Sequence, residues 1–292
     1  MGVRETLSIL RHSWADEIER LDRLVNTDPW ILLTNDDGID SPVLAPLIPA
    51  LSSIAPVRTV VPASECSWTG KVISRFNPVA LDSVDRWGQQ IWTLDGYPAD
   101  CANIGVHALF DTPPALVVSG INMGTNAGLA FFLSSGTVGA AVEGFLAGVP
   151  SLALSLELPK EAYALWRRER RLEAPTEQLL HNAVEVARSI TDEVWRSGLP
   201  SNASLMTVNM PTTTSADSPR RFAGITPTIY GSTFRRSAEG DGFEHAFTGL
   251  QIKQETGDIV ALQNQEIALT PVRFALDAEP TQEDRLRFER LS

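Results

Sequence analysis

Residues 30–38 read Trp-Ile-Leu-Leu-Thr-Asn-Asp-Asp-Gly, an apolar run that ends in one amide and two adjacent carboxylates. A short apolar run bounded by polar and turn residues is typical of a buried strand. In an open parallel sheet, ligands bind beyond the carboxyl ends of the strands. The stretch therefore predicts a buried strand that carries Asn35, Asp36 and Asp37 at the ligand-binding edge of a sheet.

Segments typical of strands alternate with segments typical of helices around this stretch. The apolar or β-branched runs are residues 57–61, 91–94, 115–119, 151–156 and 205–209, and helical patterns occupy residues 41–51, 98–109 and 136–146, with a helix-rich region over residues 160–198. Strands that alternate with helices pair in parallel through right-handed crossovers. We therefore expect an α/β fold with a doubly wound, mostly parallel sheet over residues 29–210.

Both ends of the chain differ from this core. The apolar residues of 7–24 recur at spacings typical of an amphipathic helix, within an N-terminal extension over residues 1–28. Residues 211–292 are rich in Gly and Thr, with short β patches at 259–262 and 267–270, and we interpret them as a β-rich appendage. Because strand edges in such an appendage need a partner, we expect it to take part in oligomerisation.

The composition is that of a globular protein with an acidic surface. The 24 Lys and Arg residues against 36 Asp and Glu residues give a net charge of −12, which argues against binding nucleic acid or an anionic membrane by bulk charge. The two cysteines, Cys66 and Cys101, are normal for a reducing compartment, and Glu143 interrupts the most apolar window, residues 138–156. We expect a cytoplasmic protein with no stable nucleic-acid or membrane partner.

Two further polar stretches adjoin predicted strands and helices. Residues 119–126 read Ser-Gly-Ile-Asn-Met-Gly-Thr-Asn and bring two amides to the same edge of the sheet as the aspartates. Residues 134–137 read Ser-Ser-Gly-Thr and precede a helix, where backbone N–H groups and hydroxyls form an anion site at the positive end of the helix dipole. For each motif taken alone, a plain turn or helix-capping role is the alternative interpretation.

Other chemistries fit the sequence less well. The glycine spacing matches neither the dinucleotide fingerprint nor the P-loop, and Asn35 stands where a phosphatase with a nucleophilic aspartate needs its first Asp. Carboxylate, amide and hydroxyl oxygens are hard ligands that suit Mg²⁺ or Mn²⁺ rather than zinc. We interpret the scattered His12, His107, His181 and His245 as packing or surface residues, and the basic run 166–171 as a solvated helix face.

At these residues the sequence resembles the SurE family of survival-protein nucleotidases. The segments that carry the resemblance are residues 31–39, 60–62, 96–101, 117–122, 135–141, 208–211 and 268–271. The resemblance implies a Rossmann-like core with exchanged C-terminal arms, assembled as a homodimer or homotetramer. It also implies a divalent-metal-dependent phosphatase that acts on nucleoside 5′- or 3′-monophosphates, and in some members on short polyphosphate.

The resemblance also assigns roles to single residues. It implies that the metal is held by Asp36, Asp37, Ser67 and Asn122, with Ser64 or Thr69 as alternatives to Ser67. We expect catalysis to involve Asp36, Asp37 and Asn126, and the phosphate to be held by Asn126, Ser135, Gly136 and Thr137. Residues 157–175 look inserted, and loop 63–66 departs from the family's pattern. The alternative function is therefore a metal-dependent, nucleotide-binding regulatory protein without turnover.

Overall fold

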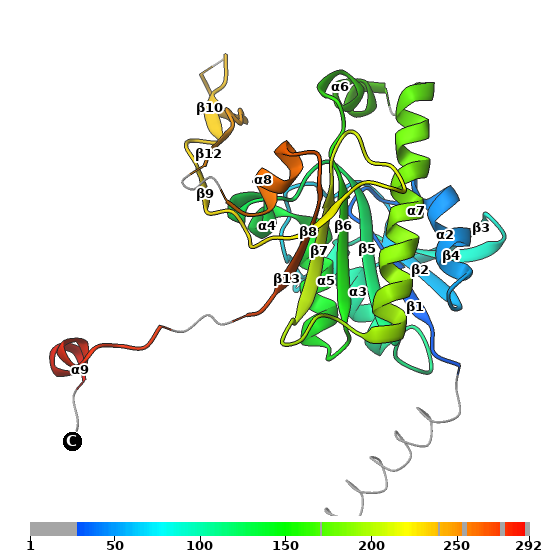
Figure 1. The fold of residues 1–292 in the computed structure, drawn as a ribbon, viewed down its shortest axis with the longest axis horizontal. Helices are drawn as coiled ribbons and strands as arrows, with labels where there is room; N and C mark the ends of the chain where they lie inside the picture. Colours follow the sequence, from blue (N-terminus) through cyan, green and yellow to red (C-terminus); the bar gives the residue numbers. More distant parts are fainter. Residues whose placement is uncertain (1–27, 170, 239, 253–255, 275–277, 290–292) are drawn as a thin grey trace, which may run out of the picture.

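The structure is a computed structural model that describes residues 28–169, 171–238, 240–252, 256–274 and 278–289. The helix expected over residues 7–24 lies outside the described residues. The strands of the main sheet are β1 (Ile31–Thr34), β2 (Val57–Pro62), β3 (Leu81–Arg86), β4 (Gln89–Leu94), β5 (Leu116–Met123), β6 (Ser151–Leu156), β7 (Leu205–Met210), β8 (Arg220–Phe222) and β13 (Ile267–Val272). Their order is β3-β4-β2-β1-β5-β6-β7-β13-β8, and helices cover the sheet (Figure 1).

Most of this sheet is parallel. From β4 through β2, β1, β5 and β6 to β7, every neighbouring pair runs in parallel. Strand β3 joins one edge and β13 the other in antiparallel pairings, and β8 then pairs in parallel with β13. The predicted α/β fold with a mostly parallel sheet is therefore confirmed.

Helices pack on both faces because the central strands are apolar on both faces. Ile31 and Leu33 belong to the cluster under α2 (Leu44–Ser52) and α7 (Ala174–Ser197). Leu32 points the other way, into the cluster under α3 (Pro98–His107). Helix α5 (Gly136–Leu146) packs on that second face as well, against Ala153. A sheet buried on both faces is what parallel strands with crossover helices require.

The residues beyond 210 are divided between the main sheet and two small sheets. Strands β8 and β13 belong to the main sheet, so part of the expected appendage extends the core. Strand β9 (Thr228–Tyr230) pairs with β12 (Leu250–Ile252), and β10 (Phe234–Arg236) pairs with β11 (Phe243–His245), both antiparallel. These two ribbons and α9 (Gln282–Phe288) lie outside the body formed by the main sheet and its helices (Figure 1).

Residues 259–262, expected as a β patch, form helix α8 (Asp258–Gln263), so that prediction is wrong. The Asp258 carboxylate accepts hydrogen bonds from the backbone N–H groups of Ile259 and Thr226, which stabilises the start of the helix. A four-residue apolar run does not distinguish a strand from a helix by its periodicity.

Two more helices, α4 (Leu129–Ser134) and α6 (Lys160–Glu169), follow β5 and β6 along the chain. Within the described ranges, no helix has the length and apolar character needed to cross a membrane.

The end of β5 is shaped by Gly120. Thr34 pairs with Ser119, so β1 and β5 end at the same edge of the sheet. Between Ser119 and Asn122 the pairing of β5 with β6 shifts register. Gly120 has a φ of +125°, and a Cβ at this position would collide with the carbonyl oxygen of Leu154. Only glycine therefore permits the irregularity that brings Asn122 to the edge beside the residues that follow β1.

Candidate functional site

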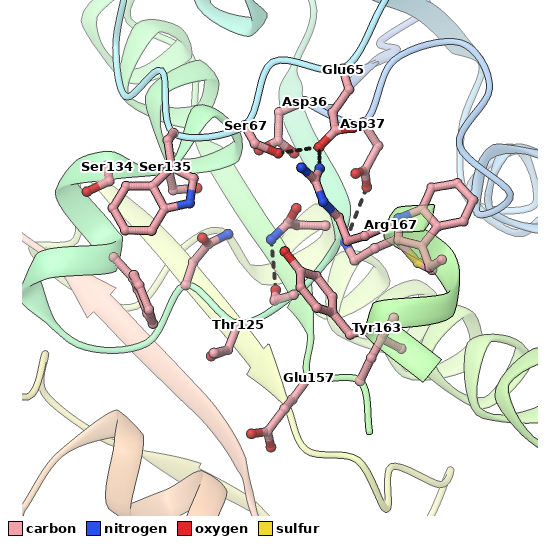
Figure 2. A pocket seen from close by; sticks show the side chains of 18 of the residues that line it. Asp36, Asp37, Glu65, Ser67, Thr125, Ser134, Ser135, Glu157, Tyr163 and Arg167 are labelled. Carbon is pink, nitrogen blue, oxygen red and sulfur yellow. Dashed lines mark hydrogen bonds and ion pairs between the residues drawn. The ribbon is translucent and has the colours of Figure 1, made fainter. Parts of the chain in front are cut away.

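A pocket of about 440 Å³ lies where β1, β5 and β6 end (Figure 2). Its lining includes six of the residues expected at the site, namely Asp36, Asp37, Ser67, Asn122, Asn126 and Ser135. The other two, Gly136 and Thr137, are buried in the first turn of α5. Motifs that lie far apart in the sequence therefore converge on one pocket, as the parallel topology predicts.

Asp36 is the buried carboxylate of the site. It is 4% exposed, and its Oδ1 accepts a hydrogen bond of 2.7 Å from Oγ1 of Thr137. Burial raises the pKa of Asp36 above its ordinary value, while the hydrogen bond from Thr137 lowers it. Ionised Asp36 is thus costly in the protein alone, and a bound cation would offset this cost.

The start of α5 lies directly against Asp36. A Cβ on Gly136 would lie 3.0 Å from the Cβ of Asp36 and 3.1 Å from the carbonyl oxygen of Cys66. The absence of a side chain at this position lets the first turn of the helix approach the carboxylate. Thr137, expected to hold a phosphate, uses its hydroxyl to bind Asp36.

Asp37 and Asn122 are held by the end of β5. The backbone N–H of Met123 donates to Oδ2 of Asp37 over 3.2 Å, which ties the loop after β1 to the neighbouring strand. The Nδ2 of Asn122 donates to the carbonyl oxygen of Gly124 over 2.8 Å. Because the amide nitrogen is used in the loop, the amide oxygen of Asn122 is the atom suited to a cation.

Ser67 lies in the loop after β2 and faces the same pocket. Its Oγ donates a hydrogen bond of 2.6 Å to Oε1 of Glu65. A hydroxyl that gives its proton to a carboxylate keeps its lone pairs for another partner. Of the alternatives, Thr69 donates to the carbonyl oxygen of Cys66, and neither Thr69 nor Ser64 is among the described residues that line the pocket. Of these three residues, Ser67 is therefore the one that lines the pocket.

Asn126 and Ser135 form a second polar group in the pocket. Asn126 is 7% exposed; its backbone N–H donates to Oδ1 of Asn209 and its Nδ2 donates to Oγ of Ser155. The hydroxyl of Ser135 accepts from the N–H of Val138 and so caps α5. Ser135 therefore has the capping role that was the alternative interpretation, and it also lines the pocket.

Sequence reasoning missed several residues that line the pocket. These residues come from the loop after β2, the segment after β6, the region of the small sheets and helix α4. They are Glu65 and Trp68; Glu157, Lys160, Tyr163, Trp166 and Arg167; His245 and Phe247; and Phe131. The run 166–171 is not simply a solvated helix face, because Trp166 is 3% exposed and Arg167 is paired with Glu65. The spacing of Tyr163, Trp166 and Arg167 on one helix face was a signal for this.

A cysteine-based mechanism does not suit this site. Cys66 is the thiol nearest to the aspartates in sequence, and its backbone N–H donates to the carbonyl oxygen of Asp36. Burial and the charge of Asp36 raise the pKa of Cys66 to about 11. The thiol is therefore protonated at neutral pH and is a poor nucleophile.

The donors in the pocket fit a hard divalent cation. No group of three or more His, Cys, Asp or Glu side chains in the described ranges could hold a metal ion. The proposed set has a different composition: two carboxylates, the hydroxyl of Ser67 and the amide oxygen of Asn122. Oxygen-only sets of this kind suit Mg²⁺ or Mn²⁺, and the buried carboxylate of Asp36 is the group that gains most from a cation.

Comparison with known proteins adds independent findings. The family model described as "Survival protein SurE" matches residues 31–233. The "5'-nucleotidase SurE" of Methanoregula boonei is 31% identical over 261 residues, covering 88% of this chain and 96% of the relative. That of Methanoculleus marisnigri is 39% identical over 183 residues, 63% of this chain and 67% of the relative. The crystal structure of the SurE protein from Aquifex aeolicus superposes with a TM-score of 0.67 at 26% identity, over 89% of this chain and 97% of that one.

Proposed function

The chain belongs to the SurE family, as its motifs predict, and from this premise we propose that it is a 5′-nucleotidase. In this proposal it hydrolyses nucleoside 5′-monophosphates to nucleoside and phosphate with a divalent metal ion, Mg²⁺ or Mn²⁺. Nucleoside 3′-monophosphates and short polyphosphate are further substrates in the same proposal. The proposal rests on one observation: the same pocket contains two aspartates, the start of α5 and an aromatic wall. This wall consists of the rings of Trp68, Phe131, His245 and Phe247.

The metal would be held by Asp36, Asp37, Ser67 and Asn122. The chemistry that a divalent ion supplies when bound is polarisation of a phosphoryl oxygen and a lower pKa for water. The side chains of this chain do the rest. One of the two carboxylates, Asp36 or Asp37, orients the attacking water and takes its proton. Thr137 keeps Asp36 in place through its hydrogen bond.

The phosphate would lie at the start of α5. Ser135 and Asn126 line the pocket there, and the backbone N–H groups of the first turn carry the positive end of the helix dipole. Gly136 contributes its backbone and the close approach of the helix to Asp36. Of the four residues expected to hold the phosphate, Thr137 acts through Asp36 in this proposal.

The nucleoside would pack on the aromatic wall. The ring of Trp68 lies 5.0 Å from that of His245, 5.4 Å from that of Phe247 and 5.8 Å from that of Phe131, measured between centroids. Trp68 is 43% exposed, so its ring is accessible to a ligand. Any nucleobase can stack on such a ring, because every base has a π-face, and this suits a nucleotide substrate.

The test is phosphate release from a panel of nucleoside 5′- and 3′-monophosphates and short polyphosphate, with Mg²⁺, with Mn²⁺ and with EDTA. We expect release that depends on the metal. Full activity in EDTA would remove the metal from the proposal. Tight nucleotide binding in isothermal titration without phosphate release would favour the alternative, a binding protein without turnover. The reason for considering this alternative is that loop 63–66 departs from the family's pattern.

Assembly and location belong to the same proposal. We propose a homodimer or homotetramer held together by residues of the small sheets, where Phe234 is 58% exposed and Phe243 is 68% exposed. Exposed apolar side chains that lie near one another mark protein–protein contacts. The free cysteines Cys66 and Cys101 favour a cytoplasmic location.

A further inference from the structure

The segment between β6 and α7 places a cation in the pocket. Helix α6 carries Tyr163, Trp166 and Arg167; Trp166 is three positions and Arg167 four positions after Tyr163, so each lies beside Tyr163 on the helix surface. Trp166 is 3% exposed and belongs to the main hydrophobic cluster, which fixes α6 to the body of the protein. Arg167 follows it and lines the pocket together with Tyr163.

Arg167 reaches the loop that carries Ser67. Its Nη1 is paired with Oε1 of Glu65, and Oγ of Ser67 donates to the same oxygen over 2.6 Å. Figure 2 shows the guanidinium directed toward Glu65, on the side of the pocket where Asp36 and Asp37 lie. Only one carboxylate thus separates the guanidinium from Ser67, a proposed metal ligand.

The charges of the pocket give this cation a purpose. Asp36, Asp37, Glu65 and Glu157 line the pocket, against Lys160 and Arg167. A phosphate monoester carries between one and two negative charges near pH 7, so it enters against repulsion from these carboxylates. A guanidinium presents parallel N–H donors that match two phosphate oxygens, and it stays charged at every working pH.

We propose that Arg167 binds two oxygens of the substrate's phosphate, and that Glu65 holds the guanidinium over the site when no phosphate is bound. This inference rests on the proposed function, because it concerns the same pocket. The side chain of Arg167 is 44% exposed, so it exchanges Glu65 for phosphate without unfolding of α6. Glu65 keeps its hydrogen bond from Ser67 after the exchange.

The next residue is the natural control. The side chain of Arg168 is 72% exposed and contacts Glu169 of its own helix. It has the same charge and the same helix as Arg167, but it does not line the pocket. A loss of general surface charge will therefore affect the variants at positions 167 and 168 equally. A loss of phosphate binding in the pocket will affect only the variants at position 167.

Isothermal titration calorimetry of inorganic phosphate binding to the full chain, with saturating Mg²⁺, tests the proposal. It needs no hydrolysis of a substrate. We expect Arg167→Gln to raise the Kd for phosphate about ten- to a hundredfold. Arg167→Lys keeps the charge without the fork and should recover part of this loss. Arg168→Gln should change the Kd by less than about twofold. If Arg167→Gln lowers the melting temperature, Arg167→Met, which keeps the apolar stem of the side chain, decides instead.

Equal phosphate Kd values for the variants at positions 167 and 168 overturn the proposal, and so does a wild-type chain that binds no phosphate. The proposed function fails separately. A chain that releases phosphate from nucleotides and binds phosphate independently of Arg167 refutes the inference alone. A chain that binds phosphate through Arg167 and releases none from any nucleotide refutes the proposed hydrolysis alone.

Discussion

Oγ1 of Thr137 donates a hydrogen bond of 2.7 Å to Oδ1 of Asp36. Thr137 is fully buried and Asp36 is 4% exposed, so this bond is shielded from water. It links the first turn of α5 to the loop after β1, two motifs that are 101 residues apart in the sequence. In the proposed function it holds a metal-binding carboxylate in place, which is the role of groups that surround the ligands of a metal.

Thr137→Val keeps the shape of the side chain and removes the donor. Because the carboxylate of Asp36 loses the hydrogen bond that lowers its pKa, we expect the Kd for Mn²⁺ to rise about ten- to a hundredfold in calorimetric titrations. Thr191→Val in α7 is the control, since Thr191 is also fully buried and its Oγ1 has no partner in the described part of the chain. An unchanged Kd in Thr137→Val would show that the bond does not support the metal site.

Asp37→Asn keeps the size of a proposed ligand and removes its charge. We expect phosphate release to fall about a hundredfold or more, because metal affinity and transition-state stabilisation are lost together. The melting temperature without metal should hardly change, since repulsion between Asp36 and Asp37 is relieved. Asp40→Asn is the control: Asp40 is an exposed residue paired with Arg86 and should retain full activity. Equal rates for the two variants would contradict the assignment of Asp37.

The raised pKa of Asp36 predicts a pH dependence of stability. A carboxyl whose pKa is higher in the folded chain than in the unfolded chain binds its proton more tightly when folded. The free energy of unfolding of the metal-free protein should therefore fall as pH rises from the ordinary Asp pKa through the raised one. Because a metal ion binds the ionised carboxylate, stabilisation by Mn²⁺ should grow over the same window.

Melting curves between about pH 4 and pH 8, with EDTA and with Mn²⁺, measure both slopes. Asp36→Asn removes the titrating group, so its metal-free stability should lack this contribution from Asp36. A variant with the same pH profile as the wild-type chain would assign the effect to another group. Glu157, whose pKa is also raised by burial, is the first candidate.

The sequence predicted the parts of the site that follow strands of the sheet. The carboxyl ends of parallel strands meet at one edge, so Asp36, Asp37 and Asn122 had to converge once the strands were recognised. The alternation of strands and helices sufficed for the mostly parallel sheet as well, but not for β8 and β13, which extend that sheet from the expected appendage. Local pattern failed at residues 259–262, where a hydrogen-bonded carboxylate, Asp258, starts a helix in a run too short to show a period.

The remaining pocket residues depend on contacts between segments remote in sequence. Arg167 meets Glu65 across 102 residues, and the ring of Trp68 meets that of His245 at 5.0 Å. His245 was interpreted as a packing or surface residue, because nothing near it in the sequence suggests a ligand. Its place in the pocket depends on ring contacts between remote segments, such as that of Phe247 with Phe131 of α4, which no local pattern encodes.

The exposed rings of the small sheets predict an assembly contact. The double variant Phe234→Glu with Phe243→Glu places charge on β10 and β11, and we expect it to lower the mass measured by size exclusion with light scattering. Phe76→Glu is the control, because Phe76 is 88% exposed but lies between β2 and β3, outside residues 211–292. If the wild-type chain and both variants have the mass of one chain, the small sheets do not hold an oligomer together.

The aromatic wall predicts which part of the substrate Trp68 recognises. Stacking of a base on a ring contributes about 1–3 kcal/mol, so Trp68→Ala should raise the KM for nucleoside 5′-monophosphates about five- to a hundredfold. The KM for ribose 5-phosphate, which has no base, should stay unchanged. Trp87→Ala is the control, since Trp87 matches Trp68 in exposure, 40% against 43%, and in φ, +52° against +60°, but lies at the turn between β3 and β4. An equal rise in KM for both substrates in Trp68→Ala would mean that Trp68 shapes the loop of Ser67 rather than binding the base.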